Sequence, residues 1–154
     1  MNPDPGAHPH DDGRAALARV HAPPILCADL ALVGGGIGPS PEDFFVDEVP
    51  EYPLSGSGEH LYVRIEKKNF TTQDAVEAVA RAAHVNPRDV GSAGMKDKLA
   101  VTTQWLSLPA SAAPVDTWQL AGALRVVEHS RHDRKLRTGQ LAGNRFRIRL
   151  HGVP

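Results

Sequence analysis

The sequence predicts an α+β fold in which several strands accompany one capped helix. Three stretches, residues 60–67, 101–106 and 145–150, alternate apolar and polar side chains with the period of two that a half-buried strand requires. Residues 71–83 instead repeat their apolar positions at the spacing of an amphipathic helix. With 154 residues, 41% of them hydrophobic and 23% charged, the chain is long enough to bury a core of its own.

The composition excludes several classes of protein. The single cysteine, Cys27, cannot form an internal disulfide and fits a reducing compartment. No apolar run approaches the length of a membrane span, and Met1–Gly13 lacks the basic start and hydrophobic segment of a secretory signal. The sequence therefore predicts a cytoplasmic protein without a membrane partner.

The N-terminal region is predicted to be a tail rather than part of the core. Residues 1–22 contain Pro, His and Asp without a hydrophobic period, which predicts disorder ahead of one domain at residues 23–154. The histidines and aspartates of the tail have no fixed ligand spacing, so a solvated tail is a better interpretation than a metal site. Residues 33–38 are rich in glycine, but Pro39-Ser40-Pro41 follows instead of the helix start that a phosphate-binding loop needs. They predict a flexible connection.

Residues 42–49 mix aromatic and β-branched side chains with acids and predict the first strand. Phe44 and Phe45 are adjacent in it, so their side chains point to opposite faces. One of them is exposed unless both faces are covered, and an exposed aromatic ring could stack on a nucleic-acid base. Packing in the core is the commoner role of a phenylalanine.

The next strand and the helix are the most clearly marked elements. The strand at residues 60–67 places three aliphatic side chains on one face. The run from Thr71 to Asp74 opens the helix with capping chemistry, and the helix has to end before Pro87. Residues 86–89 predict a capped single turn.

A glycine-bearing turn in residues 93–100 delivers one acid between two lysines, Lys96-Asp97-Lys98, and then enters the predicted half-buried strand. Gly94 allows the backbone to turn without a Cβ clash. Such a turn is usually a solvated surface element, and a catalytic acid anchored by the following strand is the alternative. On these residues alone the surface interpretation is favoured.

Beyond Pro109 the pattern is weaker. Residues 110–123 predict a short amphipathic turn, and residues 124–129 predict a strand. His129 and His132 are spaced as two zinc ligands on one helical turn would be, but no cysteine or further histidine completes a set nearby. The sequence therefore predicts a basic loop that holds histidines, and no metal site.

Positive charge is concentrated toward the C-terminus. Residues 1–60 hold ten acidic and two basic side chains, whereas residues 125–154 hold eight basic and two acidic ones. A basic loop at residues 131–139 and three arginines on one face of the following strand favour a polyanion partner, although an exposed sheet face could serve solubility alone. The candidates for contact with a phosphate backbone are Lys98, Arg131, Arg134, Lys135, Arg137, Arg145, Arg147 and Arg149.

Four separated motifs occur in a fixed order along the chain. They are Pro41-Glu42-Asp43-Phe44 with Val46 and Glu48, Gly56-Ser57-Gly58-Glu59-His60, Ala93-Gly94-Met95-Lys96-Asp97-Lys98 with Ala100-Val101-Thr102, and Arg131-His132 through Lys135-Leu136 and Gly139 to Gly143-Asn144-Arg145-Phe146. Each motif alone is weak, but four in this order at compatible spacings are specific. Together they resemble the TruD family of tRNA pseudouridine synthases from about Pro24 onward.

The resemblance implies that Asp97 is the catalytic acid and that Lys96, Phe44, Asn144 and Phe146 lie in the site that binds the uridine. It implies the pseudouridine synthase catalytic fold, a mixed and mainly antiparallel sheet with flanking helices, and a reaction without metal or organic cofactor. The implied substrate is tRNA, in which the family converts uridine 13 to pseudouridine. The basic residues above then become candidates for contact with the RNA backbone.

Two departures from the family pattern stand out. Gly38-Pro39-Ser40 occupies the place where the family commonly carries a lysine, and the family continues beyond Pro154 with an insertion domain and the second half of the catalytic domain. The sequence therefore predicts the N-terminal part of a catalytic domain, with open strand edges. A noncatalytic RNA-binding remnant and a general soluble interaction domain are the alternatives.

Overall fold

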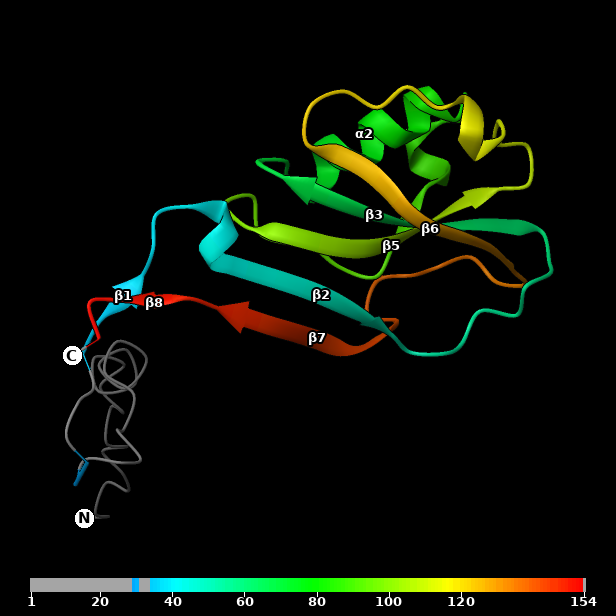
Figure 1. The fold of residues 1–154 in the computed structure, drawn as a ribbon. Coiled ribbons are helices and arrows are strands. Elements are labelled where there is room, and N and C mark those ends of the chain that lie inside the picture. Colours follow the sequence, from blue (N-terminus) through cyan, green and yellow to red (C-terminus); the bar gives the residue numbers. More distant parts are fainter. Residues whose placement is uncertain (1–28, 31–33, 154) are drawn as a thin grey trace, which may run out of the picture. The chain divides into compact units, whose positions relative to one another are not determined.

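The computed structural model describes residues 29–30 and 34–153. The predicted disordered tail and its cluster of histidines and aspartates lie outside these residues. The strands and the helix are β1 (Gly36–Ile37), β2 (Phe44–Pro50), β3 (His60–Lys68), α2 (Thr72–Ala82), β4 (Gly91–Ser92), β5 (Val101–Pro109), β6 (Leu124–His132), β7 (Leu141–Ile148) and β8 (Leu150–His151) (Figure 1). Single turns of 3₁₀ helix occupy η1 (Pro41–Asp43), η2 (Pro87–Asp89) and η3 (Val115–Thr117).

Six of these strands form one mixed sheet. Five follow the order β6-β3-β5-β2-β7, and β4 pairs with the C-terminal half of β5, at Leu106 and Ser107. All pairs are antiparallel except β2 with β5, which run parallel. The prediction of an α+β fold with a mixed, mainly antiparallel sheet is therefore confirmed. Strands β1 and β8 form a separate two-stranded ribbon.

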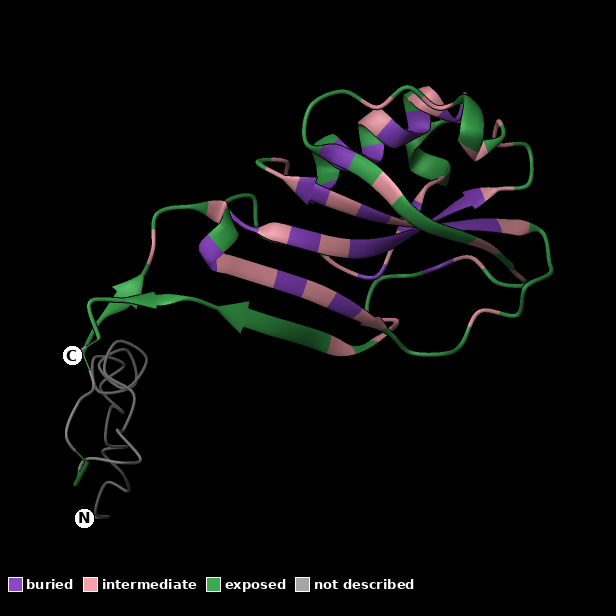
Figure 2. Ribbon diagram, in the orientation of Figure 1, coloured by how far each residue is buried: buried purple, intermediate pink, exposed green. Residues whose placement is uncertain are grey.

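The main core lies between α2 and one face of the sheet, which we call the α2 face. The register of the strands sends the odd-numbered residues of β3 and the even-numbered residues of β2, β5 and β7 to this face. Its buried aliphatic side chains pack with Val76 and Val79 of the helix; they are Leu61, Val63, Ile65, Leu106 and Leu108. Figure 2 shows burial concentrated in β3, β5 and the helix, whereas β7 and β8 are exposed.

The expectation of a half-buried β5 is wrong, because every residue from Gln104 to Leu108 is buried. This strand lies between β3 on one side and β2 and β4 on the other, and α2 covers one of its faces. On the opposite face, Trp105 packs in a small cluster with Tyr62, Ala93 and Leu136. Segments distant in sequence therefore cover both faces of a strand that the alternation pattern predicted to have one face in solvent.

Two smaller expectations are corrected by long-range pairing. The predicted strand at residues 124–129 extends to His132, because β6 pairs along β3 as far as His60. Arg131 and His132 therefore belong to a strand and not to the predicted basic loop. The predicted flexible connection at residues 33–38 includes β1, which pairs with β8 more than a hundred residues later. The predicted single turn at residues 86–89 is confirmed by η2.

The capping chemistry of α2 gives a first prediction. The Thr71 side chain accepts from the Asp74 backbone N–H, and the Asp74 carboxylate accepts from the Thr71 N–H, each at 3.0 Å. Replacing Thr71 with alanine leaves an N–H at the helix start unpaired and is expected to lower the free energy of unfolding by about 1 kcal/mol. Urea unfolding measures the loss, with exposed Thr138→Ala as the control. An equal effect of both variants would contradict this role of the cap.

Candidate active site

The turn that carries Asp97 lies on the α2 face of the sheet, between β4 and β5. The backbone N–H of Lys96 donates to the hydroxyl of Thr72, the first residue of α2, at 2.8 Å. That hydroxyl donates in turn to the side-chain amide oxygen Oε1 of Gln104 on β5 at 3.0 Å. The turn is thus tied to the helix start and to the strand beneath it, while Asp97 remains exposed.

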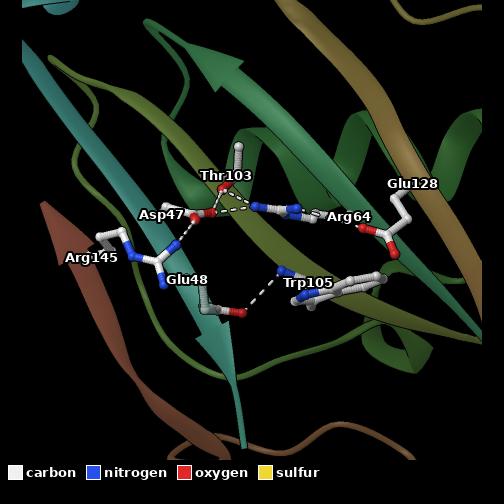
Figure 3. A network of polar contacts seen from close by, with 7 residues as sticks. All are labelled: Asp47, Glu48, Arg64, Thr103, Trp105, Glu128 and Arg145. Carbon is white, nitrogen blue, oxygen red and sulfur yellow. Dashed lines mark hydrogen bonds and ion pairs between the residues drawn. The ribbon is translucent and has the colours of Figure 1, made fainter. Parts of the chain in front are cut away.

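Lys96 is buried, although it was predicted to contact the substrate. Its Nζ lies 2.6 Å from Oε2 of Glu48 on β2, and the two side chains are only 4% and 1% exposed. The other Glu48 oxygen accepts from the backbone N–H of Trp105 at 2.9 Å (Figure 3). The pair therefore joins the Asp97 turn to β2 and β5 from below, and the structure gives the Lys96 ammonium a partner within the protein.

A second buried lysine, Lys67, holds the same turn, and the sequence analysis did not single it out. Its Nζ donates to the backbone oxygen of Asp97 at 2.8 Å and to that of Phe70 at 2.7 Å. A detectable signal was present in the sequence, because Lys67 continues the odd-numbered register of Leu61, Val63 and Ile65. A charged side chain at a core-facing position of a strand requires a specific partner.

The predicted uridine-binding residues of β2 and β7 lie on the α2 face as well. Phe44 and Phe146 stack with ring centroids 6.0 Å apart and planes inclined by 19°. Asn144 lies directly opposite Glu48 in the β2–β7 register, next to the strand position that holds Lys96. Phe146 is 55% exposed, so an aromatic surface is available on the face that carries the Asp97 turn. The structure therefore brings the five predicted site residues to one face of the sheet.

The arginines of residues 145–149 occupy the opposite face, and each has a partner there. Arg145 Nη1 lies 3.6 Å from Asp47 Oδ2, and Arg149 Nη1 lies 3.6 Å from Asp43 Oδ1. The guanidinium of Arg147 lies 4.0 Å from the centroid of the Phe45 ring. The predicted row of cations therefore exists, but the sheet separates it from Asp97.

Asp47 is the centre of a polar network on this second face (Figure 3). It accepts from the Thr103 hydroxyl and from Arg64, and Arg64 also pairs with Glu128 at 3.5 Å. Burial acts to raise the pKa of Asp47, but the hydrogen bonds from Thr103 and Arg64 outweigh it and hold that pKa below its usual value. A groove of about 550 Å³ passes over the network. The network neutralises much of the charge on this face.

The remaining basic candidates are spread over the molecule. Lys98 is exposed in the Asp97 turn. Hydrogen bonds from Thr71 lower the pKa of Asp74, and the nearby charge of Lys98 acts in the same direction. Arg131 pairs with Leu61 at the end of β3 that lies away from Lys67. Arg134, Lys135 and Arg137 follow β6, in a segment anchored by the buried side chain of Leu136. Only Lys98 is carried by the same turn as Asp97.

The described part of the chain holds neither a cluster of metal-ligand side chains nor a membrane-spanning helix. In residues 29–30 and 34–153, no three His, Cys, Asp or Glu side chains are grouped as metal ligands would be. His129 and His132 lie on β6, where each faces a residue of β3. Within the same residues, no helix has the length and apolar character needed to cross a membrane.

Comparison with known proteins identifies the sequence over most of its length. Residues 24–154 match the family described as tRNA pseudouridine synthase D (TruD). A tRNA pseudouridine synthase D from Anaeromyxobacter dehalogenans strain 2CP-C is 53% identical over 129 residues, which cover 84% of this chain and 37% of that protein. The protein of the same name from Methylococcus capsulatus is 43% identical over 148 residues, covering 95% of this chain and 40% of the relative. The chain thus spans about two fifths of the length of these relatives.

The fold agrees with this match. A crystal structure from Methanosarcina mazei assigned to tRNA pseudouridine synthase D superposes with a TM-score of 0.71 and 27% sequence identity. The superposition covers 81% of this chain and 29% of that one. Sequence and fold therefore lead to the same conclusion, that the chain belongs to the tRNA pseudouridine synthase D (TruD) family.

Proposed function

We propose that this chain carries the catalytic aspartate of a tRNA pseudouridine synthase, and that Asp97 is that residue. The observation that carries the proposal is the position of Asp97, exposed on a turn that two buried lysines and a helix start hold in place. A surface turn without a catalytic role needs no such anchoring. The membership of the family supports the same reading, because the related proteins are named for this activity.

The proposed reaction isomerises uridine without oxidation or an energy source. The bond from C1′ to N1 breaks and a bond from C1′ to C5 forms, while C5 loses a proton and N1 gains one. Such a reaction requires an ionised carboxylate held against the ribose, whether it attacks the sugar, adds to the base or removes a sugar proton. Asp97 supplies that carboxylate in each of these routes.

The other residues of the α2 face fit the binding of an unstacked base. A uridine has to leave its stack to be reached, and the exposed ring of Phe146 beside Phe44 offers it an aromatic surface. Asn144 can both donate to and accept from a base edge or the Asp97 turn. For Lys96, the buried pair with Glu48 favours support of the turn over direct contact with substrate.

The function is tested by single-nucleotide mapping of pseudouridine in an unmodified tRNA transcript. The 154-residue chain is assayed beside a chimera in which its residues 24–154 replace the matching segment of the A. dehalogenans relative. The relative itself is the positive control. We expect one new pseudouridine with the chimera, at uridine 13 if the position follows the family. A chimera that binds tRNA but forms none would favour a noncatalytic RNA-binding role.

The partner of the proposed enzyme is tRNA, and the proposed location is the cytoplasm, where tRNA is modified. The proposed reaction needs no metal or organic cofactor, because proton transfer and the carboxylate account for all bond changes. The proposed contacts to the RNA backbone come first from Lys98, beside Asp97, and then from the basic residues of β6, β7 and the segment between them.

The proposed backbone contacts can be ranked by the salt dependence of tRNA binding. Lys98→Gln is expected to reduce the slope of log K against log salt by about 0.7 to 0.9, the value for one phosphate contact. The triple change of Arg145, Arg147 and Arg149 to Gln is expected to reduce this slope by less than three times that amount. The reason is that Asp47 and Asp43 already pair with two of these arginines. A threefold larger reduction in the triple variant than in Lys98→Gln would contradict this ranking.

A further inference from the structure

We propose that Lys67 is a positioning residue for Asp97, which fixes the backbone of the turn that presents the acid. The inference rests on the proposed function of Asp97. Lys67 lies near the end of β3, on the α2 face, and its side chain is fully buried. It has no place in the sequence motifs, and its hydrogen bonds go to main-chain oxygens.

The hydrogen bonds of Lys67 all go to main-chain carbonyls. Its Nζ lies 2.7 Å from the oxygen of Phe70, 2.8 Å from that of Asp97 and 3.4 Å from that of Lys96. An ammonium group has three N–H donors, so these three oxygens can use them all. Two of the three belong to the Asp97 turn. Lys67 therefore fixes the carbonyls of the two peptide groups that flank the Asp97 Cα.

Burial of this charge has a cost that core packing alone does not explain. An unbranched apolar side chain such as methionine would fill a similar volume without removing a charge from water. Burial lowers the pKa of Lys67 to about 8, and the negative charge of Asp97 acts in the opposite direction. The two charges are therefore close enough to interact. A lysine at this position is costly for folding and useful for holding the turn.

Lys67 and Lys96 hold the turn from two different strands. The Lys96 side chain reaches down from the turn to Glu48 on β2, whereas Lys67 reaches up from β3 to the backbone at residues 96 and 97. The first contact fixes a side chain of the turn and the second fixes its peptide groups. The two contacts together hold the turn at Asp97, whereas with one of them alone the turn could pivot about that contact.

The test compares Lys67→Met with Lys68→Met in the chimera described above. Lys68 is the adjacent lysine, partly exposed, and pairs with Glu42 at 2.6 Å on the other face. Misplacing a reacting group by about 1 Å costs on the order of 100-fold in rate. We therefore expect Lys67→Met to lower the single-turnover rate of pseudouridine formation by about 10- to 100-fold, with tRNA affinity within about threefold, and Lys68→Met to leave both unchanged.

Hydrogen exchange separates positioning from a general loss of stability. In Lys67→Met, exchange is expected to accelerate in residues 94–99 and to stay unchanged in the core of α2. Equal acceleration in both segments, or a single-turnover rate within twofold of the parent, would overturn the proposal. A parent chimera that makes no pseudouridine would instead show that the proposed function fails, so the two failures are distinguishable.

The pH dependence of stability gives an independent readout of the buried ammonium. The folded protein releases the Lys67 proton near pH 8, whereas the unfolded chain holds it to about pH 10.5. Between these values the unfolded state binds more protons, so the stability of the parent relative to Lys67→Met rises with pH. The charged groups acting on Lys67 are Asp97, Lys96 and Asp74. Parallel stability curves for the two proteins across this window would contradict the buried, charged state of Lys67.

Discussion

Replacement of Asp97 with asparagine is expected to reduce pseudouridine formation by at least about 100-fold while leaving tRNA affinity within about threefold. Asparagine has nearly the same shape but no negative charge, and it can neither attack the sugar nor accept a proton as a base. The side chain is exposed, and the bond from Lys67 goes to the Asp97 backbone, so the turn itself should persist. The measurement is the single-turnover rate in the chimera, together with filter binding of the tRNA.

Asp89→Asn is the matched control for this change. Asp89 is also exposed and also lies in a short turn, η2, but outside the candidate site. It is expected to leave both rate and affinity unchanged. A rate for Asp97→Asn within tenfold of the parent would exclude Asp97 as the catalytic acid, even if the chimera is active.

Removal of the charge of Glu48 is expected to cause the largest loss of stability, about 3 to 5 kcal/mol, because it leaves the Lys96 ammonium buried without its partner. Glu48→Gln keeps an oxygen that can still accept from the Trp105 N–H, so the effect isolates the ion pair. Chemical denaturation measures the free energy of unfolding. The control is Glu66→Gln, which breaks the exposed pair with Arg125 and should cost less than about 1 kcal/mol.

A double variant distinguishes loss of the ion pair from a general failure to fold. Glu48→Gln combined with Lys96→Met removes both charges and leaves no unpaired ammonium, so it is expected to recover a large part of the stability lost in Glu48→Gln. A double variant as unstable as the sum of the two single ones would contradict the account of the buried pair. The same variants are expected to increase hydrogen exchange in residues 94–99.

Local patterns predicted the elements of this fold well where the relevant contacts are themselves local. The alternation of residues 60–67 and the capping chemistry of residues 71–74 predicted β3 and the start of α2 nearly to the residue, whereas the helix ends at Ala82, ahead of the stop expected near His84 to Asn86. The capped turn at residues 86–89 is of the same kind. In each case the backbone hydrogen bonds or the periodic face depend on neighbours within a few positions of the sequence.

The errors arose where a distant segment decides the environment. The polar residues Thr102, Gln104 and Ser107 of β5 are buried. They are covered by α2 and the Asp97 turn on one face and by the segment around Leu136 on the other. The alternation within the strand does not reveal this covering. The extension of β6 to His132 depends on pairing with His60, seventy-two residues away. Burial of both faces of a central strand is a property of the sheet order, and the sheet order was not readable from the pattern.

The sequence selected candidate residues for the site, but it could not show on which face of the sheet each of them lies. The motifs selected Phe44, Asn144, Phe146 and the Asp97 turn. The register places the first three on the α2 face, where hydrogen bonds to Lys67 and Thr72 hold the turn. The period of two also predicted that the three arginines of residues 145–149 share a face, but it could not show that Asp43, Asp47 and the Phe45 ring are their partners. The contacts of Lys67 and the burial of Lys96 depend on side chains meeting beneath the turn, which only the folded chain shows.

The measurement that tests the central claim most directly is hydrogen exchange of the chimera with and without bound tRNA, resolved by segment. The claim is that the uridine binds on the α2 face, against the Asp97 turn. It predicts that tRNA slows exchange in residues 94–99, with a smaller effect in residues 133–139, which follow β6. Slowing confined to residues 133–139, with residues 94–99 unchanged, would contradict it and place the RNA away from Asp97.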